Sequence, residues 1–277
     1  WPDGSGDHVI PDPPYSDKTH KSVRSRRMSA NDRGGRYGAD VRRVVNLGFD
    51  HLTDEERAAA AVEFARLAQR WILTFSDVET CHLWRDDLED AGLDYVRTMA
   101  WHRLGGAPQF SGARPGVASE VITVAHPKGR KRWNSGGKRG HYSHAIVLDR
   151  GHEKVRVHAT QKPEPLMAEI IGDFTDFGDL ILDAYAGSGT TGVVAKRAGR
   201  RAILIEQDER SCESIATRLE KVEPVLTEHI EDEALLRTLD IEVDRVTTTP
   251  TGVPITRCDL CRRPHSINLR HCDRCGR

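Results

Sequence analysis

Short apolar runs and segments with helical periodicity alternate along most of the chain. The runs at 71–75, 121–124 and 180–182 are too short for helices and predict buried strands. After Thr53, apolar residues recur at the spacing of one helix face as far as Arg70, and Thr53 and Glu56 form a capping box. The same reasoning predicts further strands at 9–10, 95–101 and 200–205, and further helices at 80–91, 160–171, 192–198 and 209–220. This alternation indicates an α/β protein.

A turn rich in small residues joins the strand at 180–182 to the helix at 192–198. It runs from Asp183 to Thr191, and its composition lets a ligand approach the backbone. The next strand ends at Glu206, roughly 20 residues after the turn, where the dinucleotide folds place the acid that holds a ribose. One such unit predicts a nucleotide or nucleoside site.

The residue that leads this turn distinguishes between two cofactors. Gly187, Gly189 and Gly192 have the G-x-G-x-x-G spacing, which also fits a plain dinucleotide-binding dehydrogenase. The Asp183 carboxylate would repel a pyrophosphate, whereas it can accept hydrogen bonds from the ammonium group of an amino-acid ligand. The sequence therefore favours S-adenosylmethionine over NAD.

Three motifs resemble those of one enzyme family. Asp183–Thr191 is similar to the D-P-F-x-G-S-G-T-T cofactor motif of amino-group DNA methyltransferases, and His158–Pro163 is similar to their H-P-T-Q-K-P element. Asp12–Tyr15 resembles their D-P-P-Y catalytic motif. Because the catalytic motif precedes the cofactor motif, the order is that of the permuted β class. The resemblance implies a doubly wound, Rossmann-like methyltransferase sheet with circularly permuted motif order.

The resemblance also implies a set of cofactor-binding residues. Ala159 replaces the usual proline, and Ala184 and Tyr185 replace proline and phenylalanine, but these changes keep the polar groups. A polar helix start at Thr160–Pro163 is suited to the carboxylate end of the cofactor. The expected cofactor-binding residues are Thr160, Lys162, Asp183, Tyr185, Gly187, Ser188, Gly189, Thr190, Thr191 and Glu206.

The chemistry of amino-group methylation explains the expected catalytic residues, Asp12, Pro13, Pro14 and Tyr15. An exocyclic amine conjugated to a base is a poor nucleophile, and it improves when a carboxylate and a backbone carbonyl accept its protons. Asp12 and the Pro13 carbonyl suit that role. The base must be flipped out of the duplex, and the Tyr15 ring is the candidate that stacks on it. In isolation, D-P-P-Y would indicate only a proline-rich turn.

Charge is unevenly distributed, although the formal net charge is only −1. Residues 18–43 are polar and basic, which suits a segment that closes over a flipped nucleotide or a solvated loop. Residues 126–145 combine basic side chains with Trp133 and Tyr142, which suits phosphate contact and base stacking. The family carries its target-recognition segment here, and a basic surface hairpin is the alternative. The expected DNA-binding residues are Lys128, Arg130, Lys131, Arg132, Lys138 and Arg139.

The C-terminal part contains two C-x-x-C pairs. Two such knuckles can complete a tetrahedral, structural Zn²⁺ site, with a histidine as a substitute ligand or disulfides as the alternative. The expected zinc ligands are Cys258, Cys261, Cys272 and Cys275. We therefore expect a methyltransferase domain at 1–222, a helix and Thr/Pro/Gly linker at 223–254, and a zinc-ribbon-like module at 255–277.

The composition limits the class of protein. A hydrophobic content of 38% and a charged content of 30% are typical of soluble globular proteins, and no apolar run approaches the ~20 residues that span a bilayer. No signal peptide is visible, so we expect a cytoplasmic protein that acts on DNA without a membrane partner. A homodimer is left open. The chain begins at Trp1, and the resembled family usually has one more strand upstream.

These features together predict a site-specific DNA methyltransferase that moves a methyl group from S-adenosylmethionine to N6 of a flipped-out adenine. Within the resembled family, D-P-P-Y rather than S-P-P-Y favours adenine. The alternatives are transfer to N4 of cytosine, an RNA target, or a zinc-bearing nucleic-acid-binding protein on an inactive methyltransferase fold.

Overall fold

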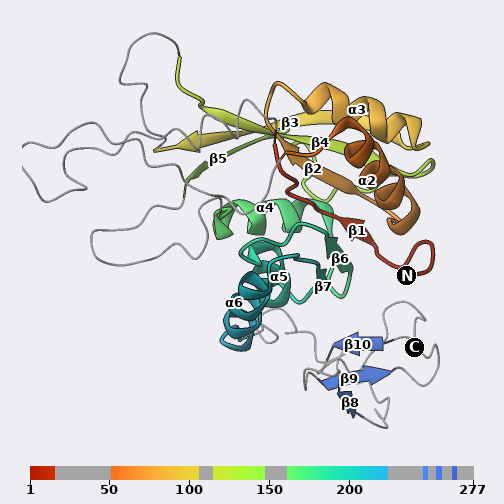
Figure 1. Ribbon diagram of the computed structural model, residues 1–277, viewed down its shortest axis with the longest axis vertical. Helices are drawn as coiled ribbons and strands as arrows, with labels where there is room; N and C mark the ends of the chain where they lie inside the picture. Colours follow the sequence, from red (N-terminus) through yellow and green to blue (C-terminus); the bar gives the residue numbers. More distant parts are fainter. Residues whose placement is uncertain are drawn as a thin grey trace, which may run out of the picture.

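The structure is a computed structural model that describes residues 1–15, 51–105, 115–146 and 161–223, together with short strands at 246–248, 254–257 and 264–266. A seven-stranded sheet with the order β5-β3-β4-β2-β1-β6-β7 forms its centre (Figure 1). The expected α/β class is therefore confirmed. Within the described ranges, no helix is long and apolar enough to cross a bilayer.

One half of the sheet is parallel and places the two motif strands side by side. Its strands are β1 His8–Val9, β2 Ile72–Ser76, β6 Leu180–Asp183 and β7 Arg201–Leu204. β1 lies between β2 and β6 and is parallel to both, with Val9 opposite Leu182. The segments that follow β1 and β6 therefore emerge at the same edge, here named the carboxyl edge. Open α/β sheets place their ligand sites at such an edge.

The other half of the sheet is mixed. Its strands are β3 Asp94–Leu104, β4 Ser119–His126 and β5 His141–Ala145. β4 is antiparallel to β2 and β3, so the start of β4 lies at the carboxyl edge and its end lies at the opposite edge. β5 is parallel to β3 and was not predicted, because Tyr142 is its single buried residue and no apolar alternation marks it.

Helices cover both faces of this sheet (Figure 1). Their bounds are α2 Asp54–Leu67 and α3 Cys81–Asp90 on one face, α4 Glu164–Phe174 and α5 Thr190–Arg197 on the other, and α6 Glu209–Glu220 beside α5. The predicted capping box of α2 is confirmed. The Glu56 N–H donates to Thr53 Oγ1 at 3.2 Å, and the Thr53 N–H donates to Glu56 Oε2 at 2.9 Å.

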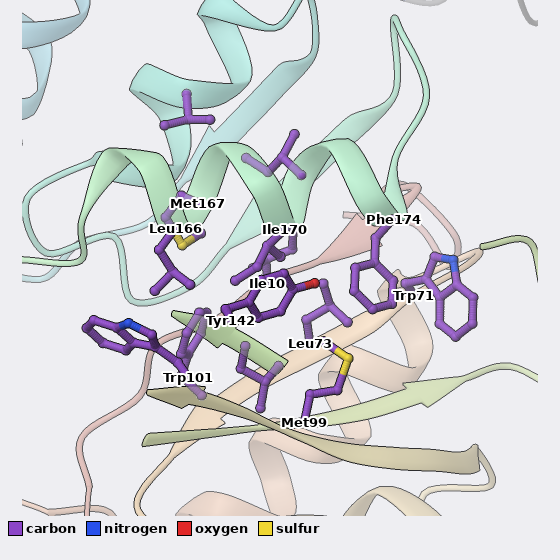
Figure 2. Close-up of a cluster of buried hydrophobic side chains, with 14 of the residues drawn as sticks. Ile10, Trp71, Leu73, Met99, Trp101, Tyr142, Leu166, Met167, Ile170 and Phe174 are labelled. Carbon is purple, nitrogen blue, oxygen red and sulfur yellow. The ribbon is translucent and has the colours of Figure 1, made fainter. Parts of the chain in front are cut away.

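The larger core lies between α4 and the sheet (Figure 2). Leu166, Ile170 and Phe174 follow one another at the helical spacing of four, so they share the face of α4 that meets the strands. Leu73 and Met99 meet them from β2 and β3. Burial of these apolar surfaces, at roughly 25 cal/mol per Å², fixes α4 on the sheet. The residues just before α4 are thereby held at the carboxyl edge.

Ile171→Ala should measure how strongly this core stabilises the fold. Ile171 is 0% exposed, and its truncation is expected to lower the free energy of unfolding by about 2–5 kcal/mol. Val62→Ala is the matched control, because Val62 on α2 is 54% exposed and its truncation should cost less than about 0.5 kcal/mol. Chemical denaturation measures both, and equal losses would contradict the role of α4 in the core.

A second sheet contains three antiparallel strands in the order β10-β9-β8. They are β8 Val246–Thr248, β9 Pro254–Arg257 and β10 Pro264–Ser266. Arg257 pairs with Pro264, so the connection between β9 and β10 contains the first cysteine pair. The predicted features outside the described residues are Thr160, the basic segment 18–43, nearly all of the helix and linker at 223–254, and all four cysteines of the two pairs.

Candidate active site

The turn at Asp183–Thr191, here named the cofactor turn after its expected ligand, begins where β6 ends. Gly187 and Gly189 have φ values of +52° and +73°, in the left-handed region that glycine adopts at little cost. A Cβ atom on Gly189 would in addition lie 3.0 Å from side-chain atoms of Ile215 on α6. The turn therefore requires glycine for its shape and for its packing, and it leads directly into α5.

Asp183 is buried at the start of this turn, with 3% of its surface exposed. Its Oδ1 accepts a hydrogen bond from the Tyr185 N–H at 3.0 Å, and the Thr191 side chain also hydrogen-bonds it. Burial raises the pKa of Asp183 to about 7, and these two hydrogen bonds oppose the rise only in part. A buried carboxyl group of this kind gains most from a cationic ligand.

Glu206 lies beside the same turn. Its Oε2 accepts the Gly187 N–H at 2.8 Å. Its Oε1 accepts the N–H groups of Gln207 and Asp208 at 2.9 and 3.0 Å. Glu206 therefore stabilises the turn, and its contact with a ribose stays a prediction. Asp208 caps α6 by accepting the Ser211 N–H at 2.9 Å.

Lys162 connects the cofactor turn to the catalytic motif. Its carbonyl accepts a hydrogen bond from Thr190 Oγ1 at 3.3 Å, at the start of α5. Its ammonium lies 2.6 Å from Asp12 Oδ2. The family resemblance placed Lys162 in the cofactor pocket. In the structure its backbone adjoins the cofactor turn, while its ammonium lies against the catalytic motif.

Asp12 follows β1 at the carboxyl edge, and both of its carboxylate oxygens have partners. Oδ2 accepts from Lys162, and Oδ1 lies 3.0 Å from the Tyr15 hydroxyl. The same hydroxyl donates to Glu120 Oε2 at 2.7 Å. The Tyr15 ring packs against the larger core while its hydroxyl joins these carboxylates. Its stacking on a base stays a prediction.

Glu120 belongs to this cluster, although the sequence pattern assigned it no role. It lies just beyond the end of β2, because the next residue, Val121, pairs with Ser76. From there its Oε2 is 3.2 Å from the Lys162 ammonium, and its Oε1 is 3.1 Å from Arg103 Nη1 on β3. The signal in the sequence was only an acidic residue opening an apolar strand, which does not indicate a site.

The cluster balances two carboxylates against two cations. Burial raises the pKa of Asp12, and Lys162 opposes that rise. Burial also acts to raise the pKa of Glu120, but the Lys162 and Arg103 cations bring it below its ordinary value. Burial acts to lower the pKa of Lys162, while Asp12 and Glu120 raise it above its ordinary value. Glu120 and Lys162 are therefore charged at neutral pH, and Asp12 is the carboxylate that takes up a proton more easily.

The six basic residues expected to bind DNA are not gathered around Asp12. Four of them lie in 128–132, directly after β4. Since β4 begins at the carboxyl edge and its eight residues cover about 26 Å at ~3.3 Å per residue, this stretch starts at the opposite edge. There Lys131 Nζ pairs with Asp94 Oδ2 at 2.7 Å. The structure does not bring these four residues to the catalytic motif.

Lys138 and Tyr142 are both held by α4. Lys138 Nζ lies 2.6 Å from Asp173 Oδ2 and 2.6 Å from Glu169 Oε1. The Tyr142 ring is 2% exposed, and its hydroxyl donates to Asp173 Oδ2 at 2.9 Å. The expectation that Tyr142 stacks on a base is therefore wrong, because β5 turns this ring into the core (Figure 2). Arg139 is exposed just before β5.

The seven-stranded sheet and its helices match the fold of solved DNA methyltransferase structures. The solved complex of M1.HpyAVI with S-adenosylmethionine matches with a TM-score of 0.55 and 24% identity, over 78% of this chain and 89% of that chain. The structure titled PvuII DNA methyltransferase (cytosine-N4-specific) matches with a TM-score of 0.57 and 16% identity, over 86% and 85%. At these identities the likeness shows the fold.

The chain belongs to the N6_N4_Mtase family, described as DNA methylase, which matches residues 7–218. The Type II methyltransferase M2.DpnII of Streptococcus pneumoniae is 33% identical over 150 residues, which are 48% of this chain and 54% of that protein. M2.LlaDCHI of Lactococcus lactis subsp. cremoris is 30% identical over 145 residues, with the same shares. The chain spans about half the length of these curated relatives. The family that the three motifs indicated is confirmed.

Proposed function

We propose that this chain transfers a methyl group from S-adenosylmethionine to the exocyclic N6 of adenine in DNA. The observation that carries the proposal is the arrangement of Asp12 and Asp183. Asp12 follows β1 and Asp183 ends the adjacent parallel strand β6, and burial together with the nearby Asp12 raises the pKa of Asp183. A proton acceptor for an amine and a carboxyl group for the cofactor therefore face the same edge. Family membership supports methyl transfer, and the D-P-P-Y motif supports adenine.

The residues of the turn fit this cofactor. Buried Asp183 suits its ammonium group, and the left-handed conformations of Gly187 and Gly189 let the adenosine approach the backbone. Glu206, beside the turn, suits the ribose hydroxyls. We further propose that the motif order is permuted, since the catalytic strand β1 precedes the cofactor strand β6 in the chain.

The chain's own residues would prepare the target amine. Bound S-adenosylmethionine would supply a methyl group carried on a cationic sulfur, and the carbon–sulfur bond would break as the methyl group passes to the amine nitrogen. Asp12 accepts one proton of the amine, and the Pro13 carbonyl accepts a hydrogen bond from the other. Burial raises the pKa of Asp12, and Lys162 opposes that rise and so favours the ionised form that accepts a proton. The Tyr15 ring would stack on the flipped base with its hydroxyl released from Asp12.

Transfer to N4 of cytosine is the second candidate. The fold is shared with PvuII DNA methyltransferase, whose title gives cytosine-N4 specificity. Both reactions methylate an exocyclic amine that donates two hydrogens, so Asp12 and the Pro13 carbonyl serve either base. The identity of the methylated nucleoside separates the two.

Labelled methyl transfer tests the proposal. Incubation with tritiated S-adenosylmethionine should label mixed-sequence duplex DNA and should leave RNA of the same sequence unlabelled. Label on RNA alone would contradict the DNA substrate. Cofactor binding without label on either nucleic acid would identify a binding protein on an inactive methyltransferase fold.

We also propose a structural Zn²⁺ site whose ligands are Cys258, Cys261, Cys272 and Cys275. The C-x-x-C spacing supports it, as does the pairing of β9 with β10 around the first cysteine pair. Within the described part of the chain, no group of side chains could hold a metal ion, so these cysteines are the candidate ligands.

Metal analysis of the purified chain tests the zinc site. The wild-type chain should contain about one Zn²⁺, and the double variant Cys258→Ser/Cys261→Ser should lose it. Cys81→Ser is the matched control, because Cys81 on α3 is a free cysteine outside both pairs and its replacement should keep the metal. A wild-type chain that holds no metal after purification without chelators would contradict the site.

A further inference from the structure

We propose that Glu120 is a positioning residue for methyl transfer: it draws the Tyr15 hydroxyl and the Lys162 ammonium partly away from Asp12, so that Asp12 stays free to accept the target amine. The inference rests on the proposed methyl transfer and adds to it a residue that acts on the proton acceptor. Glu120 stands outside the three motifs and reaches the site from β4, across the end of β2.

The Tyr15 hydroxyl carries one hydrogen and lies within reach of two carboxylates. Its oxygen is 2.7 Å from Glu120 Oε2 and 3.0 Å from Asp12 Oδ1. A hydroxyl donates its hydrogen to one acceptor at a time, and the shorter distance assigns it to Glu120. Asp12 Oδ1 is then free of the tyrosine's hydrogen. This oxygen is the one that can accept an N–H of the target amine.

The Lys162 ammonium also contacts both carboxylates, and it lies closer to Asp12. It lies 2.6 Å from Asp12 Oδ2 and 3.2 Å from Glu120 Oε2, and it donates to the Tyr15 hydroxyl oxygen at 3.0 Å. With the lysine donating to that oxygen, the tyrosine's own hydrogen points toward a carboxylate. Arg103, 3.1 Å from Glu120 on the side of β3, keeps Glu120 ionised in this buried position.

Removal of the Glu120 charge should weaken Asp12 as a proton acceptor in two ways. The Tyr15 hydrogen would pass to Asp12 Oδ1 and occupy it. The Lys162 cation would also act on Asp12 without competition from Glu120, and the Glu120 charge that raises the pKa of Asp12 would be gone, so the pKa of Asp12 and its basicity would fall. The titratable and charged groups that act on Asp12 or are acted on by it are Tyr15, Glu120, Lys162 and Asp183, while Arg103 pairs with Glu120.

Glu120→Gln tests the proposal, because it removes the charge and keeps the shape. At saturating DNA and cofactor, kcat should fall by about 10²-fold, the lower end of what a positioned proton-transfer group contributes. The acidic limb of the kcat–pH profile should move to lower pH, since Asp12 would then be protonated only at lower pH. Cofactor Kd should stay unchanged. Glu120→Asp, which keeps the charge, should return the acidic limb toward its wild-type position.

Glu63→Gln is the matched control, because Glu63 is an exposed glutamate on α2 that pairs with Arg66. Its kcat and its acidic limb should equal those of the wild type. A fall in kcat for Glu120→Gln without movement of the limb would indicate a merely structural role and would overturn the proposal. An unchanged kcat would overturn it as well.

A titration that needs no turnover separates this proposal from the proposed function. The ¹³C shift of the Asp12 carboxyl group, followed by NMR, should titrate at lower pH in Glu120→Gln than in the wild type. An equal midpoint in both proteins would overturn the influence of Glu120 on Asp12. A wild-type chain that transfers no methyl group, yet shows the expected difference in midpoint, would reject the methyl transfer alone.

Discussion

Replacement of Asp12 by alanine is expected to lower kcat for methyl transfer by about 10²- to 10⁴-fold while leaving cofactor Kd nearly unchanged. In the proposed mechanism Asp12 accepts the proton of the target amine, and it stands 2.6 Å from the Lys162 ammonium, so its loss removes the acceptor and leaves Lys162 with Glu120. The cofactor turn is built from β6 and α5 and keeps its own hydrogen bonds. Single-turnover transfer and calorimetric cofactor binding measure the two effects separately.

Asp90→Ala provides the control for this substitution. Asp90 is an exposed aspartate at the end of α3, outside the cluster around Asp12, so its replacement should leave kcat at the wild-type value. Unchanged turnover in Asp12→Ala would contradict the catalytic assignment. A large loss of cofactor affinity in the same variant would instead place Asp12 in the cofactor pocket.

Cofactor affinity is expected to depend on pH through Asp183. Its pKa is raised to about 7, so below that pH the free protein holds Asp183 largely protonated. Binding of the cofactor's ammonium favours the ionised form, and below the pKa a proton must be released first. The affinity should therefore fall about tenfold for each pH unit below 7 and level off above it. Calorimetry between pH 5.5 and 7.5, in buffers of different ionisation enthalpy, measures both the affinity and the released proton.

Asp183→Asn should weaken cofactor binding and remove this pH dependence together. The loss of a charge-assisted hydrogen bond corresponds to about 1.5–3 kcal/mol, or roughly 10- to 100-fold in Kd at pH 7.5. Asparagine keeps the size of the side chain and its ability to accept from the Tyr185 N–H. Asp90→Asn should bind as the wild type does. Affinity that survives in Asp183→Asn would place the ammonium elsewhere.

The cofactor turn could be predicted from the sequence because its determinants are local. Gly187 and Gly189 are required by a single turn, Asp183 ends the strand before it, and Glu206 follows the end of the next strand, β7, by two residues. The capping residue Thr53 was predicted for the same reason, since its side chain accepts from a backbone N–H in the first turn of its helix.

The cluster around Asp12 could be predicted only in part, because it is assembled by long-range packing. Lys162 lies 150 positions from Asp12 and reaches it because the larger core fixes α4 on the sheet. Glu120 and Arg103 arrive through the pairing of β4 with β2 and β3, whose register no local pattern specifies. Their types alone, an acid and a base near apolar strands, are also typical of ordinary surface positions.

The basic stretch at 126–145 was harder to interpret for the opposite reason. Its charges and aromatics suggested a DNA-binding surface, but composition does not tell where a connection runs. The antiparallel direction of β4 carries residues 128–132 to the edge opposite Asp12, and β5 turns Tyr142 inward. A single buried tyrosine in a polar strand gives no alternating pattern, so neither the strand nor the orientation of the ring could be predicted.

The most direct test of the central claim is the identity of the methylated nucleoside. Mixed-sequence duplex DNA is incubated with the chain and S-adenosylmethionine, digested to nucleosides and resolved by mass spectrometry beside reference compounds. The proposed site of Asp12, Lys162 and Asp183 predicts methylation of an exocyclic amine, and the D-P-P-Y motif predicts that the product is N6-methyladenine, absent from a parallel reaction with Asp12→Ala. N4-methylcytosine in its place, or no methylated nucleoside from a protein shown to bind the cofactor, would contradict it.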